Sequence, residues 1–483
     1  MAFALPSRPN LLFLMADQMQ AAVLDDGNPC LTPNFAALQA RGIRFTRAHT
    51  PNAICSPARA SLMTGLLPHN HNVWTVTHTV RPDRAVLRPA RHWAEELRQA
   101  GYRTGYFGKW HVEHTEEPGR FGWETSATAA SPQVLEAVGR AGQRMSEGRW
   151  QHEGWLTPRP GYTSHRFCGV TEVPPEERGL GIHVSNAASY LADVTTGQDP
   201  WACFVSVLEP HDPFFTGREA FDRYNGVDVS VSPTLRDNLI GRPEIYARAR
   251  APWRDWNEED HRNAAVCYYA SVTEIDTLFG RLLDQLEAAG QADNTIVVLT
   301  SDHGEALGAH GLYCKNYGAG EEIYRVPMVL AGPGIKSGRE SDVLVGLQDL
   351  HPTLLDLLGL DSPENPDSSS FADLCRADSE QLADDRCGYA EYEGTRFQLT
   401  QRILWEGDWK YVFNGFAHDE LYNLADDPHE ECNLLADSDQ GSAEADRLLS
   451  LIWGRIKETG DLTLLNSQYP ALQIGSVGPE AAL

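Results

Sequence analysis

Basic residues are scarce in this 483-residue sequence, and no apolar run is long enough to span a membrane. Lysine and arginine together number 40 against 67 aspartate and glutamate residues, which gives a net charge of −27. Such a charge repels nucleic-acid backbones and anionic lipid, so we expect no nucleic-acid or membrane partner. The hydrophobic content of 42% is ordinary and predicts a folded protein rather than a disordered chain.

Paired cysteines are also missing, because the nine cysteines are scattered and none forms a C-x-x-C motif. This excludes a zinc knuckle and a disulfide framework, and it favours a reducing compartment. The apolar run at residues 11–16 is shorter than the core of a signal peptide and follows no small-residue cleavage site. The sequence therefore predicts a cytoplasmic location and a buried strand at this position.

Short apolar runs alternate with amphipathic stretches, as in βα units on a largely parallel sheet. The predicted strands are residues 10–16, 102–107, 201–208, 295–300 and 328–331. Helices are predicted where a cap and a proline precede a glycine-terminated segment, namely Thr32 and Pro33 before residues 34–41, and Ser56 and Pro57 before residues 58–64.

Apolar residues at three- and four-residue intervals predict one long helix over residues 258–290. Weak periodicity over residues 113–200 and 213–257 predicts long loops around a site.

A polar segment, DSPENPDSSS at residues 361–370, predicts a solvated connection near a domain boundary. We expect residues 1–375 to form a catalytic domain and residues 376–483 to form a C-terminal subdomain. The subdomain should hold a small antiparallel sheet, with strands at 400–405 and 409–414 and a packed helix at 442–458. Its apolar tail, residues 466–483, is expected to pack on a neighbouring subunit in a homo-oligomer.

Three predicted strands end in polar or titratable residues: Asp17 and Gln18, Lys109 and His111, and Asp302 and His303. Ligands of open α/β sheets bind beyond the carboxyl ends of the strands, so these side chains should meet in one crevice. Two carboxylates, an amide oxygen and an imidazole suit a divalent cation; the oxygens favour calcium or magnesium, and the histidine tolerates manganese or zinc. The alternative is that both aspartates merely cap the turns that follow them.

Cys55 lies just ahead of a predicted helix start, with Arg59 about one turn further on. The positive field of the helix dipole and the guanidinium could hold an anion there. The alternative is an ordinary buried cysteine.

The segment CSPARASLMTG at residues 55–65 matches the sulfatase signature, in which a separate enzyme oxidises the cysteine to formylglycine. Further motifs follow in the family's order: TPNF at 32–35, GKWH at 108–111, EPHDP at 209–213, SDHGE at 301–305 with HGL and a lysine over 310–315, and ELYNL to NL over 420–434. The chain thus resembles the formylglycine-dependent sulfatases of the alkaline phosphatase superfamily.

The resemblance implies an alkaline-phosphatase-like α/β fold, with a largely parallel central sheet and a smaller C-terminal α+β domain carrying an antiparallel sheet. It also implies metal-dependent hydrolysis of a sulfate monoester to alcohol and inorganic sulfate, through a formylglycine at Cys55 and a covalent sulfo-enzyme intermediate. The implied partners are a small sulfate ester and a formylglycine-generating enzyme.

By motif match, the ligands of one divalent ion are Asp17, Gln18, Asp302, His303 and the modified Cys55. Calcium is the expected ion and manganese the alternative, because Gln18 and His303 stand where many members have Asp and Asn.

The same match gives Cys55, Arg59, Lys109, His111, His211 and Lys315 catalytic roles. Arg59 would orient the hydrated aldehyde, while Lys109 and Lys315 hold the charged oxygens of the ester. His211, with Lys315, would protonate the departing alcohol oxygen, and His111 would take the proton that lets the aldehyde reform. Lys109, His111, His211 and Lys315 would also bind the substrate.

A phosphonate monoester or phosphodiester hydrolase of the same superfamily is the main alternative. Those members carry hydroxyl residues in place of the lysine and histidine of GKWH, so Lys109 and His111 favour a sulfatase, with promiscuity toward phosphate esters left open. A non-catalytic metal-binding member would have lost the cysteine, the lysine or a histidine, and all are present.

Several residues near the motifs are candidates to line a pocket, whose aromatic members would suit an aryl, quaternary ammonium or sugar group: Trp74, His78, Trp110, Glu113, His114, Trp123, Phe214 and Tyr317. His69, His71 and His78 have no carboxylate close by in the sequence, which argues against a second metal site.

Overall fold

A mixed eight-stranded sheet forms the centre of the structure, a computed structural model that describes residues 8–78, 87–157, 159–315, 317–377, 386–395, 398–436, 442–465, 473 and 475–482. The strand order is β12-β2-β11-β10-β1-β8-β4-β5. The bounds are β1 Asn10–Asp17, β2 Gly42–Phe45, β4 Arg103–Gly108, β5 Thr125–Thr128, β8 Trp201–Pro210, β10 Thr295–Ser301, β11 Met328–Ala331 and β12 Arg339–Ser341. All pairs are parallel except the two that β11 makes, with β10 and with β2. All five predicted strands and the predicted fold class are therefore confirmed.

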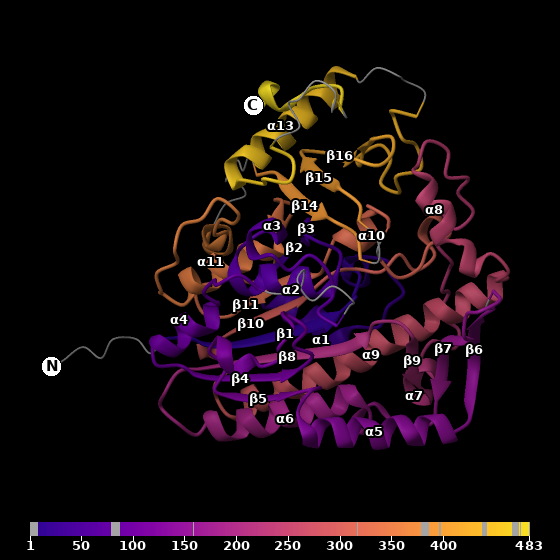
Figure 1. Cartoon of the computed structure of the whole chain (residues 1–483). Coiled ribbons are helices and arrows are strands. Elements are labelled where there is room, and N and C mark those ends of the chain that lie inside the picture. Colours follow the sequence, from indigo (N-terminus) through magenta and orange to yellow (C-terminus); the bar gives the residue numbers. More distant parts are fainter. Residues whose placement is uncertain are drawn as a thin grey trace.

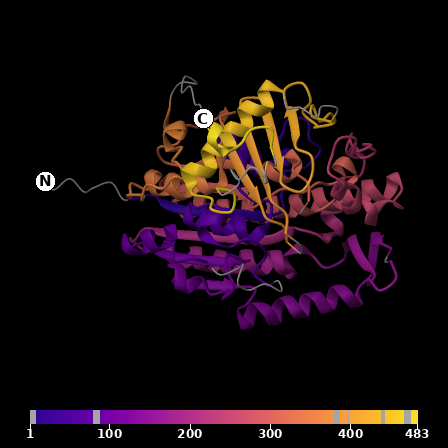
Figure 2. The same ribbon diagram turned by 45° about the horizontal axis from the view of Figure 1, so that its top comes forward.

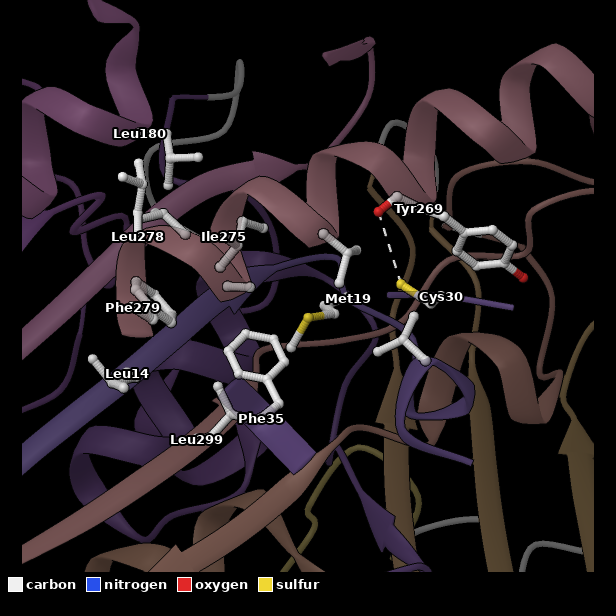
Figure 3. Packing of buried hydrophobic residues seen from close by; sticks show 14 of the residues in the cluster. Leu14, Met19, Cys30, Phe35, Leu180, Tyr269, Ile275, Leu278, Phe279 and Leu299 are labelled. Atoms are coloured by element: carbon white, nitrogen blue, oxygen red, sulfur yellow. Dashed lines mark hydrogen bonds between the residues drawn. The ribbon is translucent and has the colours of Figure 1, made fainter. Parts of the chain in front are cut away.

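Both faces of this sheet are covered by helices, because the side chains of each strand alternate between two apolar clusters. Leu12 and Leu14 of β1 pack on the side of α9 (Glu258–Ala288). Figure 3 shows Leu14 and Leu299 on the face that carries Ile275, Leu278 and Phe279 of that helix. The alternate residues of β1 face the side of α2 (Cys55–Thr64), α4 (Trp93–Gln99) and α11 (Leu350–Leu357). Burial on both faces explains why the strands are continuous apolar runs.

The helix caps differ from those expected. Thr32 is the N-cap residue of α1 (Pro33–Ala40), but its side chain makes no capping hydrogen bond. Ser56 lies inside α2, whose N-cap is Ile54, so its predicted capping role was wrong. The side chain of Asn52 accepts a hydrogen bond from the main-chain N–H of Ile54 at 2.8 Å and organises this helix start instead.

The segments predicted to be long loops hold regular elements, so that prediction was wrong. They contain α5 (Pro132–Glu147), β6 (Trp150–Leu156), β7 (His165–Thr171), α6 (Gly179–Val194), β9 (Phe214–Gly217), α7 (Arg218–Asp222) and α8 (Glu244–Ala249). Helix α6 was overlooked although its buried apolar residues recur at three- and four-residue intervals, namely Leu180, Val184, Ala187, Leu191 and Val194. A Cβ at Gly181 would lie 2.3 Å from the Cα of Glu176, so the first turn of the helix packs closely there. In Figure 1, α5 and α6 lie on one side of the central sheet, opposite the C-terminal elements.

An antiparallel sheet of four strands forms the C-terminal part: β14 (Gly388–Tyr392), β15 (Gln401–Glu406), β16 (Trp409–Asn414) and β17 (Glu420–Asn423). Helix α13 (Ala443–Thr459) packs across it, as Figure 2 shows, through residues such as Leu449 and Trp453. The remaining elements are β3 (Ala48–His49), β13 (Val345–Gly346), α3 (Pro68–His71), α10 (Glu321–Tyr324) and α12 (Ala372–Arg376). No helix among the described residues is long and apolar enough to cross a bilayer.

Two features around this sheet depart from expectation. The indole N–H of Trp453 donates to the carbonyl of Val477 at 2.9 Å, so the described part of the tail packs on the chain's own α13. The segment at 361–370 is anchored rather than simply solvated, since buried Asp367 accepts hydrogen bonds from the N–H of Leu67 and the amide of Asn70. The division at residue 375 and the homo-oligomer stay predictions.

Candidate active site and metal centre

Four strand ends and one helix start converge at the carboxyl edge of the central sheet. Asp17 ends β1, Lys109 follows β4, His211 follows β8, and Asp302 follows β10, while Cys55 is the first residue of α2. The sheet thus brings together residues that lie up to 285 positions apart, as predicted. Sequence reasoning treated only three of these strands as strand ends that carry site residues; the fourth, β8, extends to Pro210 and places His211 beside the others.

A compact group of metal-ligating side chains lies at this point. The ligand atoms of Asp17, Cys55, Asp302 and His303 all lie within 4.8 Å of one another, and all four residues are buried. Nε2 of His303 lies 3.2 Å from the sulfur of Cys55, and its Nδ1 lies 2.9 Å from the carbonyl oxygen of Gly304. The carbonyl accepts from the N–H of Nδ1, so Nε2 is the ring nitrogen that faces the group and would ligate a cation. Two carboxylates and a ligand-oriented imidazole fit a divalent cation.

Gln18 is held beside this group by three partners. Its amide oxygen accepts a hydrogen bond from the ammonium of Lys315 at 2.5 Å, and its amide nitrogen donates to Asp212 at 3.0 Å and to Glu305. Its main-chain N–H donates to Asp302 at 3.1 Å. Because the amide oxygen already faces Lys315, the role of Gln18 as a metal ligand stays a prediction.

Arg59 bridges the two aspartates from beneath. It is fully buried and donates to Asp17 at 2.9 Å and to Asp302 at 2.7 Å. Its remaining contacts are the hydroxyl of Ser206 at 2.8 Å and the carbonyl of Lys109 at 2.9 Å. The guanidinium therefore fixes the spacing of the two carboxylates and balances part of their charge.

Positive charge surrounds Cys55. Burial alone would raise the pKa of the thiol, but the charges of Lys109, Lys315 and His303 bring it well below its usual value. Burial would also raise the pKa of Asp17, as would Cys55, yet Lys109, His211 and Arg59 lower it. The ammonium of Lys109 forms an ion pair with Asp17. An anion at position 55 is thus stabilised by the chain's own side chains.

His211 and Lys315 form a joined pair. The ammonium Nζ of Lys315 lies 2.5 Å from Nε2 of His211, while Nδ1 of His211 lies 2.7 Å from the carbonyl oxygen of Asp212. The carbonyl fixes the proton on Nδ1, so Nε2 accepts the hydrogen bond from Lys315. A proton leaving this pair toward a substrate oxygen is therefore supplied by both residues together.

His111 is held in a strained backbone conformation, with a φ of 52° in the left-handed region. Its N–H donates to Glu116 at 3.0 Å, and its Nε2 lies 3.0 Å from Nδ1 of His78, whose ring stacks on it with centroids 5.0 Å apart. Its Nδ1 is buried without a hydrogen-bond partner among the described residues, and burial lowers its pKa. A neutral imidazole next to position 55 is the form that can accept a proton.

Several residues of this centre were missed from the sequence. Ser206, Asp212, Glu305 and Glu116 all contact predicted site residues, yet only Asp212 and Glu305 stand inside a recognised motif. The motifs identify ligand and catalytic residue types but not the partners that hold them. His78, which the sequence marks only as a pocket candidate, contacts His111.

Two expectations for the surroundings were wrong. Trp110, Trp123 and Phe214 are core residues and line no pocket at the site. His69 does have carboxylate partners: its Nδ1 lies 2.6 Å from Glu391, and both group with Asp461. These carboxylates come from the C-terminal part, which sequence proximity could not reveal.

Comparison with known families gives a consistent result. The family model "Sulfatase" matches residues 9–360, and the model "N-sulphoglucosamine sulphohydrolase, C-terminal" matches residues 308–452. The sulfatase YidJ of Escherichia coli (strain K12) is 29% identical over 439 residues, covering 89% of this chain and 84% of its own. A choline-sulfatase of Rhizobium meliloti (strain 1021) is 27% identical over 460 residues, covering 88% and 82%.

Solved structures share the fold. BT4656, determined in complex with its substrate D-glucosamine-2-N,6-O-disulfate, superposes with a TM-score of 0.75 at 21% identity, covering 94% of this chain and 99% of its own. The phosphonate monoester hydrolase of Agrobacterium radiobacter gives a TM-score of 0.74 at 24% identity, covering 95% and 96%. At these identities the likeness concerns the fold alone.

Proposed function

Because the chain belongs to the sulfatase family, within the alkaline-phosphatase-like superfamily, we propose that it hydrolyses a sulfate monoester at the centre around Cys55. One observation carries this proposal: the buried group of Asp17, Cys55, Asp302 and His303 lies directly beside four further residues suited to bind and protonate an ester. These are Lys109, His111, His211 and Lys315.

We propose that Asp17, Asp302, His303 and the modified residue 55, with Gln18 as a further candidate, hold one divalent cation, calcium being the expected ion. When bound, the cation supplies positive charge that favours an oxygen nucleophile and offsets the charge of the sulfate. The chain adds to this with Arg59, which keeps both aspartates in place, and with Lys109 and Lys315, which lie next to position 55 and would contact the sulfate oxygens.

The nucleophile of the proposal is a hydroxyl of hydrated formylglycine, which a formylglycine-generating enzyme forms from Cys55 by a two-electron oxidation with oxygen as the oxidant and loss of the sulfur as sulfide. This hydroxyl gives its proton to solvent and attacks the sulfur of the ester, and the bond from that sulfur to the alcohol oxygen breaks. The alcohol oxygen takes a proton from the His211–Lys315 pair. His111 then accepts the proton of the second hydroxyl, the aldehyde reforms and sulfate departs. Water rehydrates the aldehyde, so one water is consumed per ester.

A phosphonate monoester or phosphodiester hydrolase is the second candidate. The fold of the Agrobacterium enzyme supports it, as does the presence of Gln18 and His303 in the ligand group. Lys109, which pairs with Asp17, and His111 support the sulfatase, because the phosphonate hydrolases of the superfamily carry hydroxyl residues in their place. Activity toward both sulfate and phosphonate esters would be expected, because the same positively charged side chains around position 55 can bind either anion.

The first test is the mass of the peptide that carries Cys55, taken from protein made together with a formylglycine-generating enzyme. The proposal predicts an aldehyde in place of the thiol, and release of sulfate from an aryl sulfate faster than hydrolysis of a phenyl phosphonate ester. The Cys55→Ala variant should lose this activity, whereas Cys432→Ser, at an exposed cysteine, should retain it. An intact thiol in active protein would overturn the formylglycine step, and faster phosphonate hydrolysis would favour the second candidate.

A further inference from the structure

A separate cleft of about 580 Å³ lies beside the loop that leads to Lys315, because Gly311 is part of its lining. The rest of the lining comes from residues 235–238, Ala247, residues 250–251, 253–254 and 256–258, and His261, and it includes none of the four residues of the metal-ligating group. Its volume is in the range of sites that hold one or two sugar-sized rings.

The cleft is a locally basic region of an acidic protein. Its lining holds three arginines against two acidic residues, Asp237 and Glu258, in a chain whose net charge is −27. Arg236, Arg250 and Arg254 line the cleft. Arg250 donates to the main-chain carbonyl of Asp237 at 2.6 Å, and Arg254 pairs only with its exposed neighbour Asp255 at 3.5 Å. Within the described residues, Arg236 makes neither an ion pair nor a hydrogen bond.

The acidic residues of the cleft are engaged with other partners. The carboxylate of Asp237 lies 2.6 Å from Nδ1 of His310, and Glu258 pairs with Arg262 at 3.4 Å. The arginines therefore keep most of their charge available to a ligand. Guanidinium groups bind sulfate and carboxylate through paired, charge-assisted hydrogen bonds.

Aromatic rings form one wall of the cleft. The rings of Trp256 and His261 lie 5.4 Å apart, and His261 stacks on Tyr313 with centroids 5.7 Å apart and an interplanar angle of 11°. The indole N–H of Trp256 donates to the carbonyl of Trp155 at 3.0 Å, which fixes its orientation. A fixed indole offers a flat apolar surface for the C–H face of a sugar ring.

From these observations we propose that the cleft binds a sugar residue bearing sulfate or carboxylate groups, at a site distinct from the catalytic centre. This inference rests on the proposed sulfatase function and extends it, because it names anionic saccharides as the class of ligand that the cleft binds. The cleft also contacts the catalytic loop: His261 bonds the hydroxyl of Tyr313 at 2.8 Å, two residues before Lys315. A ligand there lies next to the loop that positions a catalytic residue.

The test is calorimetric binding of a sulfated heparin tetrasaccharide to the full chain, compared with its desulfated counterpart. The sulfated form should bind more tightly than the desulfated form, which keeps only its carboxylates, and the affinity of both should fall with rising salt. Arg236→Glu should weaken binding by about tenfold or more, since one charge-assisted contact is replaced by repulsion. Arg248→Glu is the matched control, because Arg248 is exposed nearby but does not line the cleft, and it should bind as wild type.

Equal affinities of the Arg236→Glu and Arg248→Glu variants would overturn the proposal, as would absence of binding to the sulfated form at low salt. Lys109→Met, altered at the catalytic centre, should retain the Arg236-dependent binding. If the tetrasaccharide releases sulfate and Arg236→Glu raises its KM, the ligand is a remote unit of the substrate; binding without hydrolysis identifies a separate saccharide ligand. Failure of the enzyme to hydrolyse any sulfate ester would refute the proposed function but leave this binding result standing.

Discussion

The pairing of Lys315 with His211 makes a quantitative prediction about protonation of the departing alcohol. Their 2.5 Å contact, with the other nitrogen of His211 fixed by the Asp212 carbonyl, couples the protonation of the two residues. General acids typically contribute about 10²- to 10⁴-fold in rate. We therefore expect Lys315→Met and His211→Ala each to lower kcat/KM for an alkyl sulfate by at least about a hundredfold.

The Lys315→Met/His211→Ala double variant shows whether the two residues act as one coupled acid or as two independent groups. Independent losses would multiply to about 10⁴-fold or more, whereas a unit that is already broken should lose no more than about tenfold beyond the worse single variant. The double variant of a coupled pair should therefore be about 10- to 100-fold more active than two independent losses would make it. This difference corresponds to the roughly 1.5–3 kcal/mol expected of a hydrogen bond to a charged group.

The assay compares an alkyl sulfate with 4-nitrophenyl sulfate, whose alcohol departs without needing a proton. The same variants should lose clearly less activity on the nitrophenyl ester. Lys457→Met, at an exposed lysine of α13, is the control for removal of a positive charge. Multiplicative losses in the double variant, together with equal losses on both esters, would refute the reasoning.

Other predictions concern the centre and the stability of the fold. Arg59→Ala leaves two buried aspartates without their shared partner and should lower the free energy of unfolding by about 3–5 kcal/mol in urea titrations. Gln18→Asp should change metal preference, measured as metal content and activity across calcium, manganese and magnesium; identical profiles would place Gln18 outside the ligand shell. The Gly108→Ala variant should lose both stability and turnover, because its Cβ would lie 1.8 Å from the Ser206 carbonyl oxygen at a φ of 111°. Burial opposes protonation of His69, but Glu391 raises its pKa to about 9 from 6.5, so its contribution to stability is full below about pH 6.5 and is lost as the pH rises through 9. Urea midpoints should fall over that window in the wild type and stay flatter in His69→Gln.

The central sheet could be predicted from the sequence because β1 and β10 are buried on both faces, and both therefore consist of uninterrupted apolar runs. Their polar ends, Asp17 and Asp302, therefore located the centre correctly. Helix α6 could have been predicted as well, because Leu180, Val184, Ala187, Leu191 and Val194 recur at helical intervals within a segment that was interpreted as a loop. His69 was judged without partners because Glu391 lies 322 residues away, a separation that only tertiary structure closes.

The contacts around Gln18, Glu305 and His78 were equally out of reach, since they depend on side-chain direction rather than residue type. Motifs identify which side chains perform the chemistry, whereas the packing of the residues between the motifs determines how those side chains are oriented. Whether the predicted ligand and catalytic roles hold is a question for the variants above.

Helix α2 is buried along its whole length, and only 2% of Cys55 is exposed. An oxidising enzyme cannot close around a thiol in that position once the helix has packed under the C-terminal sheet and α11. The proposed modification must therefore happen on the nascent or unfolded chain, in competition with folding itself. The active fraction of a preparation then depends on the rate of modification relative to the rate of folding. Rapid synthesis with little modifying enzyme should yield well-folded protein that still carries the thiol, and no later treatment of that folded protein should restore activity.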